Sequence, residues 1–302
     1  MSPVVPTDPT ATEATGKRWT VASETGVLTD VLLCRPDNYA YIPTNTIAKA
    51  TIAGGAHLDH QALFAQYREL EDALSGADVR LHYLEPEPHL PYQVYTRDSS
   101  QVTPWGAVVT QLFRPQRRGE YASALRFYNA TDGGPWGYST AGTVEGGDIH
   151  IIRPGLLAIG HSGERTDEAG ARQFGDLFAR QGWDVRLVGF AEHFLHLDVI
   201  FSMVGDGVAL ACREVLDDGF LDWLAANKIR VIDVSYRETM HDMACNVLAL
   251  GRDRIVSPRH CARVNAALRA EGFTVLDPDL SRFSAGGGSV HCMTMPLKRI
   301  GV

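Results

Sequence analysis

The chain has 302 residues, of which 45% are hydrophobic and 21% are charged, so it is long enough to bury a substantial core. Its formal net charge is −8 and it contains no basic tract, which argues against nucleic acid or an anionic membrane surface as a partner. Its apolar runs are far shorter than the about 20 residues that a transmembrane helix requires. These properties indicate a globular protein with an ample core.

The first 22 residues and the cysteines indicate the cellular setting. Residues 1–22 are rich in Pro and Thr and lack the apolar core of a secretion signal, so we expect a disordered lead-in before a single domain over residues 23–302. The cysteines are scattered, odd in number and without Cys-x-x-Cys spacing: Cys34, Cys212, Cys245, Cys261 and Cys292. This pattern predicts free thiols in a cytoplasmic protein, with at most one of them catalytic.

The first half of the domain predicts a strand–helix–strand unit followed by a hairpin. A strand over residues 28–34 precedes a helix capped by Asp59, and a second strand covers residues 79–83. The helix has one apolar face, which consists of Leu63, Tyr67, Leu70 and Leu74. Residues 101–112 predict a hairpin around a Pro-Trp-Gly turn.

The second half repeats a unit of two strands, a helix and a third strand. The first copy covers residues 148–153, 156–160, 166–181 and 183–188; the second covers 199–204, 208–212, 218–227 and 229–234; the third covers 246–250, 255–257, 261–271 and 273–276. Trp183, Lys228 and Phe273 open equivalent strands at intervals of 45 and 45 residues. Such a period is typical of a repeat array or propeller, and the chain has room for about five units. An ordinary α/β fold with coincidental spacing is the alternative.

Polar residues gather at four places where a strand should be apolar, and three of these places begin a repeat unit. They are residues 95–100, 144–150, 194–201 and 286–294. If the units surround an axis, these starts converge at its centre. His196 and Asp198 are two residues apart and would share one face of a strand. The three glycines before Cys292 predict a constrained loop that carries a functional thiol.

Each of these motifs also has a purely structural interpretation. His196 and Asp198 could be a satisfied pair at a strand end, and Arg97 and Asp98 could be a surface ion pair. Residues 145–148 could be an acidic turn, and the glycines a flexible tether. Together, however, the motifs suit one chemistry. A guanidinium group is a planar cation with a fork of donors, which two carboxylates can hold.

That chemistry predicts a small cationic guanidino compound as the partner. Asp98 and Asp198 would hold its two edges. The bound cation would favour the thiolate of Cys292, the nucleophilic form of the thiol. His196 could then protonate a leaving amine and afterwards deprotonate water.

The order of the motifs resembles the guanidino-group modifying enzyme superfamily, which includes arginine deiminases, arginine dihydrolases, dimethylarginine hydrolases and amidinotransferases. The resemblance covers residues 28–299 and rests on Thr96-Arg97-Asp98, Arg117-Arg118-Gly119-Glu120, Glu145-Gly146-Gly147-Asp148, Gly163-Glu164-Arg165, His196-Leu197-Asp198 and the Gly-rich loop that ends at Cys292. It implies a five-bladed pseudo-symmetric α/β propeller (pentein) of ββαβ repeats, formed by a single catalytic domain.

The resemblance also implies a role for each site residue. The implied catalytic residues are Cys292, His196 and Glu145, and the implied substrate-binding residues are Asp98, Asp198, Asp148, Arg117 and Arg165. In this scheme Cys292 attacks the guanidino carbon to form an amidino-thioether, and Glu145 supports His196. Arg117 and Arg165 match positions that face the substrate carboxylate in arginine deiminases. No cofactor and no metal are implied, and a homo-oligomer is left open.

The expected activity is hydrolysis of the guanidino group of arginine or an arginine-like compound, and amidino transfer to an amine is the alternative. Ser284 and Ala285 stand where deiminases typically carry an Arg, and the Gly-Gly-Gly-x-x-His-Cys loop is closer to an amidinotransferase or dihydrolase. Two further classes are a non-catalytic binding protein and a metal-dependent hydrolase. The candidate metal ligands are His193, His196 and Asp198, Asp148 and His150, and His241 and Asp242.

Overall fold

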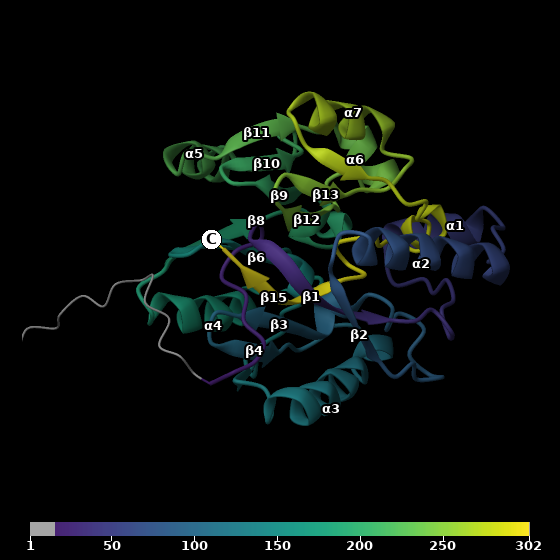
Figure 1. The fold of residues 1–302 in the computed structure, drawn as a ribbon, viewed down its shortest axis with the longest axis horizontal. Helices are drawn as coiled ribbons and strands as arrows, with labels where there is room; N and C mark the ends of the chain where they lie inside the picture. Colours follow the sequence, from purple (N-terminus) through teal and green to yellow (C-terminus); the bar gives the residue numbers. More distant parts are fainter. Residues whose placement is uncertain (1–15, 302) are drawn as a thin grey trace, which may run out of the picture.

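The computed structural model describes residues 16–301, and within them five three-stranded sheets surround a central axis (Figure 1). In every sheet the middle strand pairs antiparallel with the inner strand and parallel with the outer one. From the inner strand outward, the sheets are β15 (Met295–Ile300), β1 (Val27–Cys34) and β2 (Arg80–Leu84); β3 (Ser100–Thr103), β4 (Gly106–Val109) and β5 (Gly137–Tyr138); β6 (Ile149–Arg153), β7 (Leu156–His161) and β8 (Asp184–Gly189); β9 (Phe201–Gly205), β10 (Val208–Ala211) and β11 (Arg230–Asp233); and β12 (Leu248–Gly251), β13 (Arg254–Val256) and β14 (Thr274–Leu276). The expected five-bladed α/β propeller of ββαβ units is confirmed.

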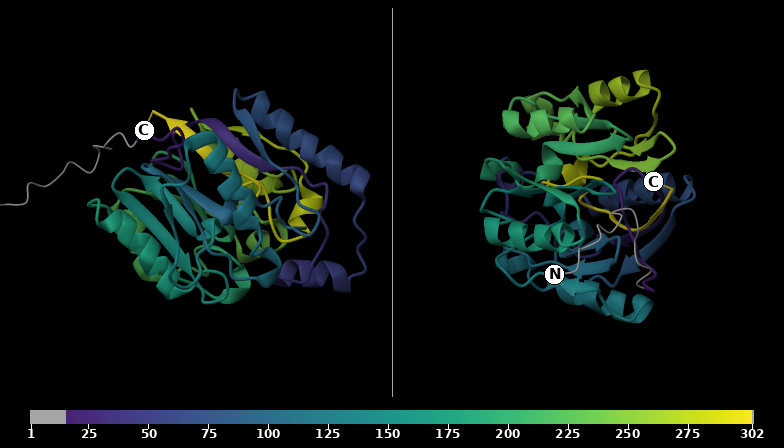
Figure 2. Two further views of the ribbon diagram at one scale, coloured as in Figure 1. Left: turned by 90° about the horizontal axis from the view of Figure 1, so that it is seen from below. Right: turned by 90° about the vertical axis from the view of Figure 1, so that its left-hand side faces the viewer.

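One helix in each unit links the middle strand to the outer strand and lies on the outside of the molecule (Figures 1 and 2). These helices are α2 (His60–Ser75), α3 (Glu120–Asp132), α4 (Glu168–Ala179), α5 (Asp218–Ala226) and α7 (Ala262–Ala270). Asp59, Asp167 and Asp217 cap three of them, because each side chain accepts a hydrogen bond from a backbone N–H of the first turn. None of the described helices is both long enough and apolar enough to cross a bilayer.

Three shorter helices occupy other connections: α1 (Thr46–Ala53), α6 (Tyr236–Asp242) and α8 (Ser281–Ser284). Helix α1 is tied to the loop before Cys292, because the Thr51 hydroxyl donates to the carbonyl of Ala285 at 2.7 Å. The N-cap of α1, Asn45, donates through its side chain to the carbonyl of Gly286 at 3.0 Å. These contacts fix the glycine loop against a neighbouring element.

The ring of blades is closed by the two ends of the domain. Strand β15 near the C-terminus pairs with β1 near the N-terminus, with Val27 opposite Ile300 and Leu32 opposite Met295. Strand β15 was not expected from the sequence, because it contains Pro296, which lacks the N–H that a ladder requires. The register shifts between Asp30, which pairs with Lys298, and Val31, which pairs with Pro296.

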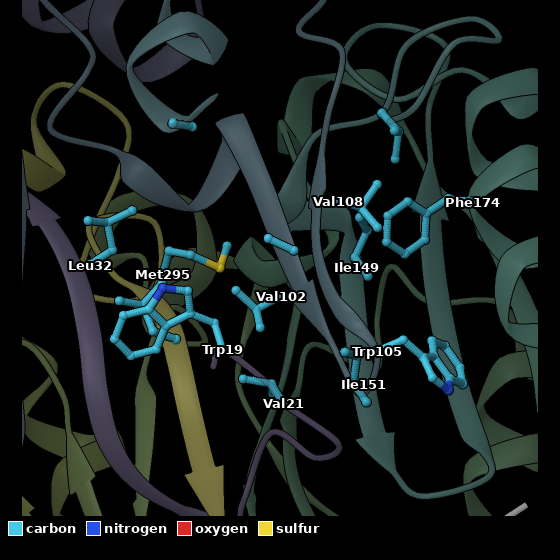
Figure 3. Close-up of a cluster of buried hydrophobic side chains, with 14 of the residues drawn as sticks. Trp19, Val21, Leu32, Val102, Trp105, Val108, Ile149, Ile151, Phe174 and Met295 are labelled. Atoms are coloured by element: carbon cyan, nitrogen blue, oxygen red, sulfur yellow. The ribbon is translucent and has the colours of Figure 1, made fainter. Parts of the chain in front are cut away.

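Residues before the expected domain start also belong to the core. Figure 3 shows Trp19 and Val21 among Leu32, Val102 and Met295, and Trp19 is only 1% exposed. The Val21 N–H donates to the carbonyl of Thr103 at 3.1 Å. The expected boundary at residue 23 is therefore too late, because burying an indole contributes a large apolar area to folding. Residues 1–15 of the expected lead-in lie outside the described residues.

Candidate active site

Three turns of 3-10 helix bring polar side chains to the axis. They are Thr96–Ser99, Gly146–Asp148 and Leu197–Val199, and each precedes the inner strand of a blade. The convergence of the unit starts is therefore confirmed. The expected strand position of His196 and Asp198 is wrong, because Asp198 lies inside one of these turns. There the Leu197 N–H donates to Asp148 Oδ1 at 2.8 Å instead of to a neighbouring strand.

The glycine loop before Cys292 is constrained, as the sequence predicted. Gly287 has a φ of +91°, which favours glycine, and a Cβ on it would overlap the side chain of Asn45. A Cβ on Gly288 would overlap the ring of Tyr95. Larger residues would therefore displace the loop that carries the thiol.

The thiol of Cys292 is held by two polar side chains. Asn246 Nδ2 donates to Cys292 Sγ at 3.1 Å, and Asp198 Oδ2 lies 3.3 Å from the same sulfur. Asn246 Oδ1 also accepts from the backbone N–H groups of His291 at 3.1 Å and Cys292 at 3.3 Å. Asn246 thus fixes both the sulfur and the backbone that carries it.

Asn246 was not expected as a site residue, because this residue stands at the start of an apolar run. The repeat nevertheless marks its position by a polar residue that recurs before the inner strands. Asp98, Asp148, Asp198 and Asn246 each stand just before an inner strand, at intervals of 50, 50 and 48 residues. Aligning the units by this polar position identifies Asn246 as the member from the fifth blade.

The surroundings of Cys292 favour the thiol form. Burial raises its pKa well above the ordinary value, and the carboxylates of Asp198 and Asp98 raise it further. The donation from Asn246 acts in the opposite direction. A cation that neutralised the two carboxylates would lower the pKa of the thiol and favour the nucleophilic thiolate.

His196 and Glu145 form the opposite part of the site. His196 Nε2 lies 2.8 Å from Glu145 Oε2, whereas the buried Nδ1 has no hydrogen-bond partner and lies 3.8 Å from Asp98 Oδ1. A carboxylate only accepts hydrogen bonds, so Nε2 carries a proton toward Glu145. Nδ1 is then the nitrogen that is free to exchange a proton with a reacting group.

His196 is cationic at neutral pH. Burial opposes its charge, but Asp98, Asp148 and Glu145 overcome this effect and raise its pKa to about 9. Glu145 remains ionised because, against the cost of burial, Arg165 at 3.0 Å and His196 lower its pKa. The pair therefore presents a buried acid to the site.

The three aspartates differ in how many acceptor positions they leave free. Asp98 already accepts from the Gly147 N–H at 3.1 Å and from Arg117 Nη1 at 2.6 Å. Asp198 Oδ1 and Asp148 Oδ2 are buried without a partner. Burial and the nearby Asp198 raise the pKa of Asp148 to about 7. Asp198 thus offers an ionised oxygen that a guanidinium can occupy.

The two arginines occupy different places. Arg117 donates to Asp98 and, through Nε at 2.9 Å and Nη2 at 2.8 Å, to Glu120. All three of its nitrogens have protein partners, so it holds Asp98 and does not face a carboxylate site as expected. Arg165 bridges Glu145 and the carbonyl of Thr44, and its Nε has no partner.

A small cavity of about 130 Å³ leads to Arg165. Its lining includes the basic residues Lys49, Arg114 and Arg165, the acidic residues Glu164 and Glu192, and Leu195. Arg114 is paired with Glu164. Leu195 has a φ of +74°, a strained conformation for a branched side chain, and it directly precedes His196. The cavity therefore presents both basic and acidic side chains beside Leu195, the residue that precedes His196.

The ligand sets considered for a metal hydrolase are not assembled. Among residues 16–301, the clusters with metal-ligand chemistry are Glu24, His150 and His291, and Asp98, Glu145 and His196. His193 lines the cavity beside Arg165, and His241 belongs to helix α6. The five cysteines are all free, as the sequence predicted.

Asn246→Asp is expected to slow alkylation of Cys292 by iodoacetamide at least roughly tenfold at pH 8, because the variant keeps the acceptor for the two backbone N–H groups but replaces the donor to sulfur with a negative charge. Peptide mapping of the labelled cysteine measures the rate. Asn265→Asp is the matched control, since Asn265 is also buried but bonds to Ser257 and Pro258. An unchanged rate in Asn246→Asp would remove this role.

The alkaline limb of the pH dependence of kcat/KM is expected near pH 9, where His196 loses its proton. Glu145→Gln should move that limb to lower pH, because the anion that stabilises the imidazolium is gone. The raised pKa of His196 also makes the free energy of unfolding depend on pH. The stabilisation that His196 contributes is complete below its ordinary pKa of 6.5 and is lost as the pH rises through about 9. Rate profiles and denaturant titrations at several pH values test both statements, and an unmoved limb in Glu145→Gln contradicts them.

The fold and the site together define a member of the guanidino-group modifying pentein superfamily. Residues 38–299 match the family model described as N,N dimethylarginine dimethylhydrolase, eukaryotic. The chain belongs to this family. Family membership points to a guanidino-group hydrolase.

Similar proteins agree with this placement. The uncharacterized protein YkgA of Bacillus subtilis (strain 168) is 29% identical over 92% of this chain and 94% of its own length. The arginine deiminase of Rhodococcus opacus (strain B4) is 28% identical, and the match covers 77% of this chain and 67% of that protein. The N-terminal domain of ArgZ, an arginine dihydrolase of cyanobacteria, superimposes with a TM-score of 0.78 at 18% identity, covering 89% of this chain and 98% of that one.

Proposed function

We propose that the protein hydrolyses the guanidino group of arginine or of an Nω-substituted arginine through a covalent adduct on Cys292. One observation carries the proposal: the buried sulfur lies 3.3 Å from Asp198, whose second oxygen is free to receive a guanidinium. A cation on Asp198 and Asp98 would place its carbon beside the sulfur and lower the pKa of the thiol at the same time.

The reaction proceeds in two balanced steps. In the first, the Cys292 thiolate forms a C–S bond to the guanidino carbon, a C–N bond breaks, and the leaving amine takes the proton from His196 Nδ1. In the second, water attacks the same carbon, His196 takes a proton from that water, and the C–S bond breaks to restore the thiolate. The products are a ureido compound and one amine or ammonia.

Two basic side chains of the cavity beside Arg165 support an amino-acid substrate. Lys49 and Arg165 line the cavity, and the Nε of Arg165 has no partner, so a carboxylate at the far end of the substrate would find donors there. The family description names N,N-dimethylarginine, and two of the similar proteins are an arginine deiminase and an arginine dihydrolase. We therefore place both compounds in the substrate class.

The test incubates the full chain with L-arginine, N,N-dimethyl-L-arginine and agmatine, which lacks the carboxylate. Mass spectrometry then follows ureido products and released amines, with and without an added amine acceptor. We expect hydrolysis of at least one amino acid, slower reaction of agmatine, inhibition by iodoacetamide and indifference to EDTA. Amidine on the acceptor would establish the transferase alternative, and loss of activity with EDTA would establish a metal enzyme.

A further inference from the structure

A second histidine lies behind Asp198, on the side away from its free oxygen, and the proposed mechanism does not use it. His291 Nδ1 is 2.8 Å from Asp198 Oδ2, and His291 Nε2 is 3.6 Å from Glu24 Oε2. The three side chains are at most 5% exposed. They form a buried row in which an imidazole lies between two carboxylates.

Other charged and titratable groups surround this row. The ring of His150 stacks on His291 with centroids 5.5 Å apart and planes 7° apart, and Arg97 Nε donates to the His291 carbonyl at 3.3 Å. Cys292 is the remaining neighbour of Asp198 Oδ2.

On the basis of the proposed function, we infer that His291, supported by Glu24, is a positioning residue that orients Asp198 for guanidinium binding. The Nδ1–H of His291 occupies Oδ2, so the carboxylate cannot rotate freely and Oδ1 is left for the cation. His291 directly precedes Cys292, and Asn246 fixes the backbone N–H groups of both residues. The same two-residue segment therefore positions both the nucleophile Cys292 and His291, which holds Asp198.

The charge balance of the row agrees with this role. A buried carboxylate without a donor tends to bind a proton, and a neutral Asp198 would lose its attraction for a cation. Although burial opposes it, the hydrogen bond from His291, together with the charge of His196, lowers the pKa of Asp198. Glu24, also buried, has its pKa lowered mainly by the same imidazole and by Arg97. Burial lowers the pKa of His150 to about 4, so that ring is neutral at pH 7.

Three substitutions separate the contacts of His291. His291→Asn can keep a donor near the position of Nδ1, so the bond to Asp198 survives. His291→Gln carries its amide farther out, toward Glu24, and loses that bond. Glu24→Gln removes the charge behind the imidazole while leaving the imidazole in place. His241→Gln is the control, because His241 is exposed on helix α6.

The probes are 2-chloroacetamidine, a cation shaped like a guanidinium, and iodoacetamide, which is neutral. The ratio of their alkylation rates at Cys292 reports guanidinium recognition. For His291→Gln we expect this ratio to fall roughly 10- to 100-fold, the range for loss of a hydrogen bond to a charged group. The acid limb of amidine labelling should also move to higher pH, since Asp198 would then ionise at higher pH. His291→Asn should stay within a few-fold of the wild type.

The outcomes distinguish this inference from the proposed function. A wild-type protein that shows no preference for the amidine contradicts the proposed function itself. A wild-type preference that persists unchanged in His291→Gln, with the same acid limb, overturns the role of His291. If His291→Gln fails to fold, Glu24→Gln decides: a smaller shift of the acid limb in the same direction supports the inference, and an unmoved limb contradicts it.

Discussion

Cys292→Ser is expected to abolish hydrolysis of every guanidino substrate, with a loss on the order of 10⁴-fold or more in kcat. The hydroxyl is a poor nucleophile in a site whose acids already disfavour an anion, and Asp198 and Asn246 hold it as they hold the thiol. The substitution changes little volume, so the free energy of unfolding should change by no more than about 1 kcal/mol. Steady-state rates and thermal unfolding of the same preparation measure both effects.

Two other cysteines provide matched controls. Cys245 and Cys261 are buried, and burial is the main cause that raises the pKa of each thiol. Neither contacts an acid of the site, so Cys245→Ser and Cys261→Ser should retain activity. If either of these variants is inactive while Cys292→Ser is active, the nucleophile has been misassigned.

Asp198→Asn is expected to reduce kcat/KM by roughly 100-fold or more, because it removes the ionised oxygen that receives the guanidinium. The amide must also accept the hydrogen bond from His291, which turns its N–H₂ toward the cation. Labelling of Cys292 by 2-chloroacetamidine should slow in parallel, since the bound cation no longer lowers the pKa of the thiol. Labelling by iodoacetamide should not slow.

Asp98→Asn tests the second carboxylate that is proposed to bind the guanidinium. It should also lower kcat/KM, but with a loss of stability, because Asp98 Oδ2 is paired with buried Arg117 at 2.6 Å. Asp206→Asn is the control, since Asp206 lies in the exposed turn between β9 and β10. Wild-type kinetics in both Asp98→Asn and Asp198→Asn would show that these acids are structural.

Much of the fold could be predicted because the repeat is local. Paired strands and helices recur at a fixed period, and Asp59 caps its helix as a sequence pattern indicates. The closing strand β15 and the burial of Trp19 could not be predicted in this way. Both depend on contacts between residues far apart in the sequence, and a repeat pattern does not predict such contacts.

The site was predictable to the extent that its residues break an apolar pattern. Cys292, His196 and Asp198 stand out in this way, and the structure brings them to the axis with Glu145. Asn246 and His291 did not stand out, because an amide before a strand and a histidine beside the thiol have ordinary structural interpretations. Arg117 was expected at the substrate carboxylate, and its pairing with Glu120 and Asp98 emerged only from three-dimensional packing.

The most direct test of the account is the mass of the covalent intermediate. The protein is mixed with L-arginine or with N,N-dimethyl-L-arginine, quenched in acid during turnover and digested, and the peptide that contains Cys292 is weighed. Loss of ammonia from the first compound and of dimethylamine from the second leaves the same amidino-thioether, so we predict one identical adduct from both on Cys292. It should accumulate or fail to form in His196→Ala. Ureido product released with no adduct on that peptide, or an adduct on a different cysteine, would contradict the account.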